Sequence, residues 1–249
     1  MSTLALVQDM RVLFVHGLEG HPNGTKVRVL REQGFDVHAA DMHMSKWNLR
    51  RKNSVARQLL QMPEPWLAAG LGLVGLASSV RRRSAAGAFA SAALSTGWLA
   101  VRRRALIGQA MTRSFRACVD VQRDALAAYR PDIVIGSSWG GAVVAELILE
   151  GSWAGPTILL APAFQRVHVW MNAGDVSSAS QRFRLRAEEV PTVIFHDRSD
   201  ATVPYLDSVR LAAGSTIDLR TVDAGGHRLL ELLERGELAQ CLRELAEAG

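Results

Sequence analysis

The chain has 249 residues, of which 48% are hydrophobic, so it is long and apolar enough for one α/β domain with a full core. The formal net charge of +5 is unevenly distributed, because residues 50–104 hold ten basic side chains and one acid, Glu64. The high isoelectric point of the sequence therefore comes from this one segment and does not indicate a general affinity for nucleic acids. Cys118 and Cys241 form no CxxC pair or metal spacing and are expected to be reduced, structural thiols.

Strand and helix patterns alternate along the chain. Short apolar runs predict strands over 11–15, 35–39, 133–135, 157–160, 192–195 and 216–220. Helical spacing predicts helices over 25–33, 114–129, 142–149, 204–213 and 227–246. This alternation predicts an α/β fold with a mostly parallel sheet of about six strands and helices on both faces.

One long segment interrupts the alternation. About seventy residues separate the second predicted strand from the helix at 114, although a crossover needs only short loops and one helix. The segment contains two uncharged runs, 66–80 and 84–101, each followed by three arginines. We expect a helical hairpin here, and we divide the chain into a core of 1–44 and 112–249 and an insertion of 45–111.

The stretch VIGSSWGGAVV, residues 134–144, predicts a nucleophilic serine. A serine in a tight strand-to-helix turn exposes its oxygen above the sheet, provided that small residues stand two places to either side. Gly136 and Gly140 meet this need around Ser138, whereas Ser137 would have Ile135 and Trp139 there. The alternative is a glycine-rich turn in which Ser138 only caps the following helix.

Two later loops offer partners for that serine. A nucleophilic serine needs a histidine base and a carboxylate that orients the base, in the chain order Ser, Asp or Glu, His. HDRSDATVP and DAGGHRLLE follow two of the predicted strands and supply Asp200 and His227. Both loops lie at carboxyl ends of strands, where ligand sites gather in α/β sheets. The alternative for His227 is a residue near a helix N-cap.

Four motifs together resemble the α/β-hydrolase superfamily. VLFVHGLEG resembles its oxyanion strand and HG turn, GSSWGG its nucleophile elbow, HDRSDATVP its acid loop and GGH its histidine loop. HGLEGHPNGTK further resembles the small YqiA-like esterases of this superfamily. The resemblance implies that Asp200 is the acid, in preference to Asp197 or Asp207. It also implies that the backbone N–H groups of Leu18 and Trp139 form the oxyanion hole.

The sequence therefore predicts a serine hydrolase that cleaves a carboxylic ester or thioester through an acyl-enzyme on Ser138. An acyltransferase or a peptidase would use the same residues, and the alternative class is a non-catalytic binding protein or a membrane-associated scaffold on a hydrolase fold. We expect no cofactor and no nucleic-acid partner. We also expect no metal, because His38, Asp41 and His43 lie around a strand end without a further ligand cluster. The oligomeric state stays open.

The insertion leaves three alternatives. Its uncharged runs of 15 and 18 residues are shorter than the roughly 20 that cross a bilayer, which makes a spanning hairpin the least favoured. A soluble cap over Ser138 or a hairpin on an anionic membrane surface fits better. The N-terminus MSTLALVQDM lacks a secretory pattern. We therefore expect a cytoplasmic protein, with peripheral binding to the inner face of a membrane through 45–111 as an option.

Overall fold

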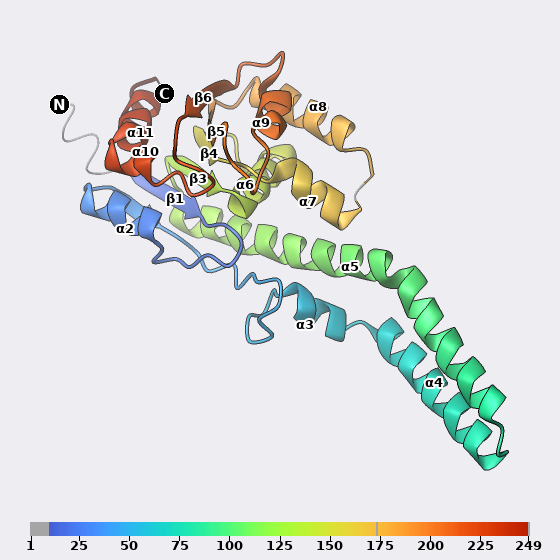
Figure 1. Ribbon diagram of the computed structural model, residues 1–249. Coiled ribbons are helices and arrows are strands. Elements are labelled where there is room, and N and C mark those ends of the chain that lie inside the picture. Colours follow the sequence, from blue (N-terminus) through green and yellow to red (C-terminus); the bar gives the residue numbers. More distant parts are fainter. Residues whose placement is uncertain (1–9, 173, 249) are drawn as a thin grey trace.

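The computed structural model describes residues 10–172 and 174–248. Within these residues six strands form one fully parallel sheet in the order β2-β1-β3-β4-β5-β6 (Figure 1). The strands are β1 (Arg11–Val15), β2 (Asp36–His38), β3 (Ile133–Ser137), β4 (Thr157–Leu160), β5 (Thr192–Asp197) and β6 (Asp218–Val222). This confirms the predicted parallel sheet of about six strands.

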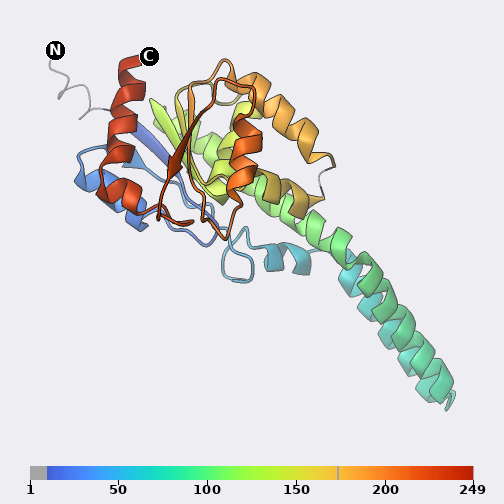
Figure 2. The same cartoon turned by 45° about the horizontal axis from the view of Figure 1, so that its top comes forward.

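Helices connect the strands and cover the sheet. They are α2 (Thr25–Glu32), α3 (Val55–Leu60), α4 (Pro63–Arg81), α5 (Ala85–Tyr129), α6 (Trp139–Leu149), α7 (Phe164–Met171), α8 (Val176–Ala187), α9 (Tyr205–Ala212), α10 (Glu231–Glu234) and α11 (Glu237–Ala248). Figure 2 shows α2 and α11 on one side of the sheet and α5 on the other. Helix α8 has no counterpart among the predicted helices, and Asp175 caps it by accepting from the amides of Ser177 and Ser178.

Two apolar cores enclose the sheet. Because successive strand residues point to opposite faces, Val12 and Ile135 pack with α2, α10 and α11, while Leu13 and Val134 pack with α5 to α8. The central strand β3 is buried along its whole length. Burial on both faces fixes the carboxyl end of β3, where the predicted nucleophile lies.

The predicted helix over 227–246 is wrong. Residues 223–230 are a loop, and two helices, α10 and α11, follow it. Gly236 separates the helices with a φ of 72°, in the left-handed region where a helix cannot continue. His227 consequently lies in a loop after the last strand rather than in a helix.

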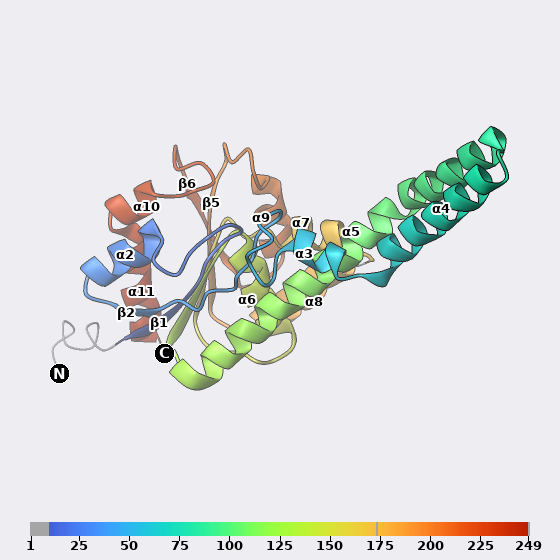
Figure 3. The ribbon, with the colours of Figure 1, turned by 90° about the horizontal axis from the view of Figure 1, so that it is seen from below.

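Helix α5 is one continuous helix of 45 residues. The predicted helix over 114–129 is its C-terminal part, and its N-terminal part pairs with α4 as the predicted hairpin. Arg102, Arg103 and Arg104 do not interrupt it, because arginine is a good helix former. Figure 3 shows that the hairpin extends away from the sheet. The hairpin also points away from α6, whose N-cap is Ser138.

Small residues form the contact between the two arms of the hairpin. A Cβ on Gly72 would lie 2.6 Å from Ser95 Oγ, and one on Gly75 would lie 2.5 Å from Ser91 Oγ. Large apolar side chains point outward instead, with Phe89 83% and Val101 82% exposed. Among the helices of residues 10–172 and 174–248, none combines the length and the apolar character that crossing a membrane requires.

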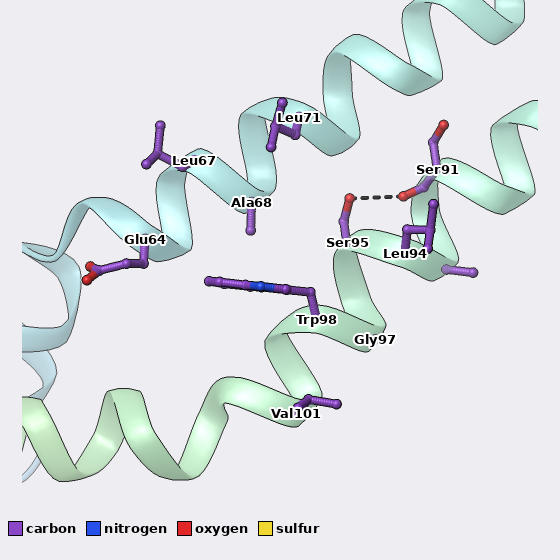
Figure 4. Close-up of a pocket in the computed structure, with 11 residues that line it drawn as sticks. Glu64, Leu67, Ala68, Leu71, Ser91, Leu94, Ser95, Gly97, Trp98 and Val101 are labelled. Carbon is purple, nitrogen blue, oxygen red and sulfur yellow. Dashed lines mark hydrogen bonds between the residues drawn. The ribbon is translucent and has the colours of Figure 1, made fainter.

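A groove of about 800 Å³ runs between these arms. Trp98 projects from α5 toward α4, where Ala68 faces it (Figure 4). Leu71 and Leu94 line the same groove and are mostly exposed. Apart from Trp98, the hairpin therefore has small residues at the contact between its arms and large apolar residues exposed, the reverse of the usual distribution in a globular protein.

Candidate active site

Ser138 lies in the turn between β3 and α6, at the carboxyl end of the central strand. Its backbone has φ 55° and ψ −114°, outside the regions of ordinary helices and strands. Such a conformation costs on the order of 1–3 kcal/mol and persists only where the surroundings enforce it. Here β3 and α6 enforce it, and the turn directs the serine side chain out of the sheet.

The flanking glycines make this turn possible. A Cβ on Gly136 would lie 2.8 Å from the carbonyl oxygen of Gly140, and a Cβ on Gly140 would overlap the carbonyl oxygens of Val15 and His16. Backbone atoms cannot move aside cheaply, so both positions require glycine. The neighbouring Ser137 has a different environment, where its hydroxyl accepts a hydrogen bond of 2.9 Å from Lys26 Nζ.

The structure brings the three predicted residues Ser138, His227 and Asp200 into one hydrogen-bonded chain. Ser138 Oγ lies 2.9 Å from His227 Nε2, and His227 Nδ1 lies 2.7 Å from Asp200 Oδ2. The loop after β5 supplies Asp200 and the loop after β6 supplies His227. Since Asp200 accepts the proton on Nδ1, Nε2 of a neutral His227 presents its lone pair to the serine hydroxyl.

Asp200 is held as a carboxylate. Its Oδ1 accepts from the amides of Thr202 (2.7 Å) and Val203 (2.9 Å). Burial alone would raise the pKa of Asp200, but the hydrogen bonds from His227, Val203 and Thr202 outweigh burial and hold this pKa below its usual value. The group is therefore ionised at neutral pH and can stabilise a protonated His227.

A second histidine supports this carboxylate. His196 Nε2 lies 3.0 Å from Val203 O and 3.2 Å from Asp200 Oδ2, and its Nδ1 lies 2.6 Å from Ser208 Oγ. Burial lowers the pKa of His196, although its contacts with Val203 and Asp200 act in the opposite direction. A neutral ring satisfies this set, with Nε2 donating and Nδ1 accepting from Ser208. Sequence reasoning missed this positioning residue, since no local pattern marks it.

Asp197 ties the acid loop to the histidine loop. Its Oδ1 accepts from the amide and the hydroxyl of Ser199, and its Oδ2 accepts from the amide of Gly226, the residue before His227. Burial alone would raise the pKa of Asp197, but these hydrogen bonds lower it further than burial raises it. Asp197 therefore positions the loop that carries His227, a role that the sequence did not reveal.

The two residues predicted to supply oxyanion donors adjoin the turn at Ser138 and the turn after β1. Trp139 is the first residue of α6, and Leu18 follows Gly17, where a Cβ would lie 3.4 Å from Ser138 Cβ. Within the described ranges, neither the Leu18 nor the Trp139 amide donates a hydrogen bond to another residue. The turn that holds Leu18 is closed by the Gly20 amide, which donates to Gly17 O at 3.0 Å.

The histidine and aspartate residues before the insertion pair with other groups. Asp41 lies 3.3 Å from Arg51 and 3.4 Å from His43. His16 contacts Gly17 O through Nδ1 and accepts from the Met42 amide through Nε2. Burial lowers the pKa of His16, so its ring is neutral and braces the turn before Leu18. In the described part of the chain no group of three or more possible metal ligands occurs.

This arrangement can carry out nucleophilic chemistry. A neutral His227 can accept the hydroxyl proton as Ser138 Oγ attacks an electrophilic carbon, and Asp200 stabilises the cation that results. The amides of Leu18 and Trp139, which have no partner among the described residues, are the candidate donors to a developing oxyanion.

Comparisons with known proteins find similarity among solved structures alone. No protein-family model matches the sequence, and no curated protein matches it. A putative hydrolase of the α/β superfamily from Xanthomonas campestris pv. campestris is 16% identical, covers 97% of this chain and 99% of its own, and has a TM-score of 0.52. A monoacylglycerol lipase from Paleococcus ferrophilus is 13% identical, with 96% and 95% covered and a TM-score of 0.53.

A putative YdeN-like hydrolase from Pectobacterium atrosepticum gives a similar result. It is 15% identical, covers 99% of this chain and 96% of its own, and has a TM-score of 0.51. At such identities a structural match establishes the fold alone. These matches over nearly the whole chain, together with the parallel sheet and the strand–Ser138–helix turn, show that the chain has the α/β-hydrolase fold.

Proposed function

We propose that the protein is a serine hydrolase that cleaves a carboxylic ester or thioester through an acyl-enzyme on Ser138. The observation that carries the proposal is the hydrogen-bonded chain from Ser138 through His227 to Asp200, with separations of 2.9 and 2.7 Å. The lipase among the structural neighbours supports an ester as the substrate class.

In the first half of the reaction, Ser138 Oγ attacks the carbonyl carbon while His227 Nε2 accepts the hydroxyl proton. The amides of Leu18 and Trp139 stabilise the oxyanion of the tetrahedral intermediate. The bond to the leaving group then breaks, and His227 transfers its proton to the departing oxygen or sulfur. Water repeats these steps on the acyl-enzyme, with His227 as the base, and releases the acid and free Ser138.

A non-catalytic binding protein on the same fold is the competing class. Such a protein has no need for a strained serine, or for a base and an acid hydrogen-bonded in sequence. The strain of order 1–3 kcal/mol at Ser138 is a cost that catalysis would explain and binding alone would not. An acyltransferase would share the acyl-enzyme and differ only in the acceptor that replaces water.

The test is hydrolysis of p-nitrophenyl esters of increasing acyl length, together with a matched thioester and anilide. We expect turnover of esters by the wild type and a loss of several orders of magnitude in Ser138→Ala. The Ser137→Ala variant should still form the acyl-enzyme, because Ser137 Oγ contacts Lys26 instead of His227. Equal rates for the wild type and Ser138→Ala in folded protein would contradict the proposal.

We further propose that the hairpin of α4 and the N-terminal part of α5 binds an anionic lipid surface. Among its outward apolar residues, Phe89, Leu94 and Val101 are between 75% and 83% exposed, and this apolar surface needs a covering partner. Six arginines and one acid lie between residues 63 and 104. A second copy of this positive hairpin would be repelled, whereas anionic headgroups would attract it.

Vesicle flotation tests the membrane proposal. We expect the wild type to float with vesicles that contain phosphatidylglycerol and to stay behind with pure phosphatidylcholine. Phe89→Ser combined with Val101→Ser should abolish flotation, while the control pair Leu185→Ser and Leu206→Ser, at exposed leucines outside the hairpin, should not. Failure of the wild type to float with anionic vesicles would remove this proposal and leave the hydrolase proposal intact.

A further inference from the structure

A small cavity lies beside Ser138, on the α2 side of the turn after β1. It has a volume of about 130 Å³, and its lining includes Gly17, Gly24, Lys26, Ser137 and Arg228. We refer to it as the Lys26 cavity. Its lining comes from the turn after β1, the first turn of α2, the end of β3 and the loop that carries His227. Its size suits one small polar group rather than an acyl chain.

Lys26 and Arg228 bring positive charge to the Lys26 cavity, and no carboxylate among the described residues pairs with either of them. No carboxylate lines it, and in the described residues Lys26 and Arg228 form no ion pair. Among the residues that the structure describes, Lys26 Nζ donates to the neutral hydroxyl of Ser137 alone, at 2.9 Å. Burial, together with the nearby Arg228, lowers the pKa of Lys26 to about 8. An anion in the cavity would stabilise the buried ammonium of Lys26 and offset its repulsion by the exposed Arg228.

The first turn of α2 adds to this positive field. Its N-cap, Gly24, provides no side-chain cap, and the first turn contains no acidic residue. The N–H groups there have no partner within the helix, and the helix dipole places partial positive charge at this end. Gly24, Thr25, Lys26 and Val27 all line the cavity. The free amides therefore lie on the same cavity as the two cations.

The Lys26 cavity adjoins the proposed catalytic site. Gly17 lines it, and a Cβ on Gly17 would lie 3.4 Å from Ser138 Cβ. Ser137, which immediately precedes Ser138 in the chain, also lines the cavity, and so does Arg228, which immediately follows His227. A molecule bound at Ser138 can therefore reach the cavity with a short substituent.

We infer that the Lys26 cavity binds an anionic group, a carboxylate or a phosphate, carried by the ester that Ser138 cleaves. That the anionic group belongs to an ester substrate rests on the proposed function. That the cavity binds an anion rests on the residues of the cavity alone. It assigns Lys26 and Arg228 to substrate selection rather than to the chemical step. Carboxylate and phosphate are the anions that arginine and free helix amides hold best.

Direct binding tests the anion site without catalysis. Ser138→Ala protein is titrated calorimetrically with inorganic phosphate and with succinate at constant ionic strength, so that both anion classes are compared. We expect saturable binding of at least one anion, weakened roughly ten-fold by Arg228→Gln or Lys26→Met. Arg28→Gln, on the exposed side of the same helix, is the matched control and should bind like its parent. Equal dissociation constants in the parent and Arg228→Gln would overturn the inference.

Kinetics separate this inference from the proposed function. The substrates are a p-nitrophenyl ester with a terminal carboxylate and its neutral methyl-ester analogue. We expect kcat/KM to favour the anionic substrate in the wild type, and Arg228→Gln to lose that preference while it retains turnover of the neutral ester. Hydrolysis of both esters without any preference would overturn the anion site and leave the hydrolase standing. Anion binding without hydrolysis of either ester would refute the hydrolase and support the anion site.

Discussion

Asp200→Asn is the most informative single substitution, because the surroundings of Asp200 determine which way an amide must point. Oδ1 faces two backbone N–H donors, from Thr202 and Val203, so the oxygen of an asparagine must stay there. The amide nitrogen then replaces Oδ2, 2.7 Å from His227 Nδ1, and donates to it. The ring proton of His227 moves to Nε2, which can no longer accept the proton of Ser138.

The expected magnitude follows from this tautomer. Loss of the correct tautomer in a Ser-His-Asp site lowers kcat by about 10⁴-fold, or about 5.4 kcal/mol in the barrier. KM should change little, because Asp200 is buried behind His227 and does not reach the substrate. His196 also loses its acceptor on Asp200, so a modest loss of stability accompanies the kinetic effect.

The assay is steady-state hydrolysis of a short p-nitrophenyl ester, with circular dichroism to establish that the variant is folded. Asp207→Asn is the matched control, since the Asp207 carboxylate lies on α9, 3.9 Å from Arg210, and contacts no member of the chain at Ser138. It should retain activity within about two-fold, because the Asp207 carboxylate forms no described hydrogen bond to Ser138, His227 or Asp200. Activity of folded Asp200→Asn within ten-fold of the wild type would refute the reasoning.

Three further outcomes are expected. Gly140→Ala should cost about 3 kcal/mol in urea unfolding, because its Cβ overlaps two backbone carbonyl oxygens, whereas Gly70→Ala, in open space, should not destabilise the protein. The folded pKa of Lys26, about 8, lies below its ordinary 10.5, so folding releases a proton between these values and stability rises with pH. Relative to Lys26→Met, the wild type should therefore gain about 2 kcal/mol between pH 6.5 and 9.5 in phosphate-free buffer. His196→Phe should lower kcat about ten-fold at constant KM and reduce stability by about 2–4 kcal/mol, since Val203 O and Ser208 Oγ lose their partner.

The positions of the strands and of the Ser138 turn were accessible from sequence, because each depends on local constraints. The apolar runs identify the strands, and the turn at Ser138 needs glycine at two fixed places, both of which the sequence contains. The break at Gly236 was also readable, and the predicted helix over 227–246 ignored it. The continuous α5 was missed because three arginines suggested a boundary where none exists.

Contacts distant in sequence were not accessible in this way. The hydrogen bond from Lys26 to Ser137 joins residues 111 positions apart, and the one from Gly226 to Asp197 joins residues 29 positions apart. Nothing near Lys26 in the sequence indicates that its amine is buried or that it lacks a carboxylate partner. The direction of the hairpin likewise depends on how the C-terminal part of α5 packs on the sheet. The narrower resemblance to YqiA-like esterases and the division at residues 44 and 112 stay predictions.

The central claim is that Ser138 is a nucleophile activated by His227. The most direct measurement is labelling with a fluorophosphonate probe, followed by mass spectrometry of the peptide that contains both Ser137 and Ser138. We predict one adduct per chain on Ser138, absent in Ser138→Ala, retained in Ser137→Ala and formed far more slowly in Asp200→Asn. An adduct that persists in folded Ser138→Ala, or a folded wild type that forms none, would contradict the account.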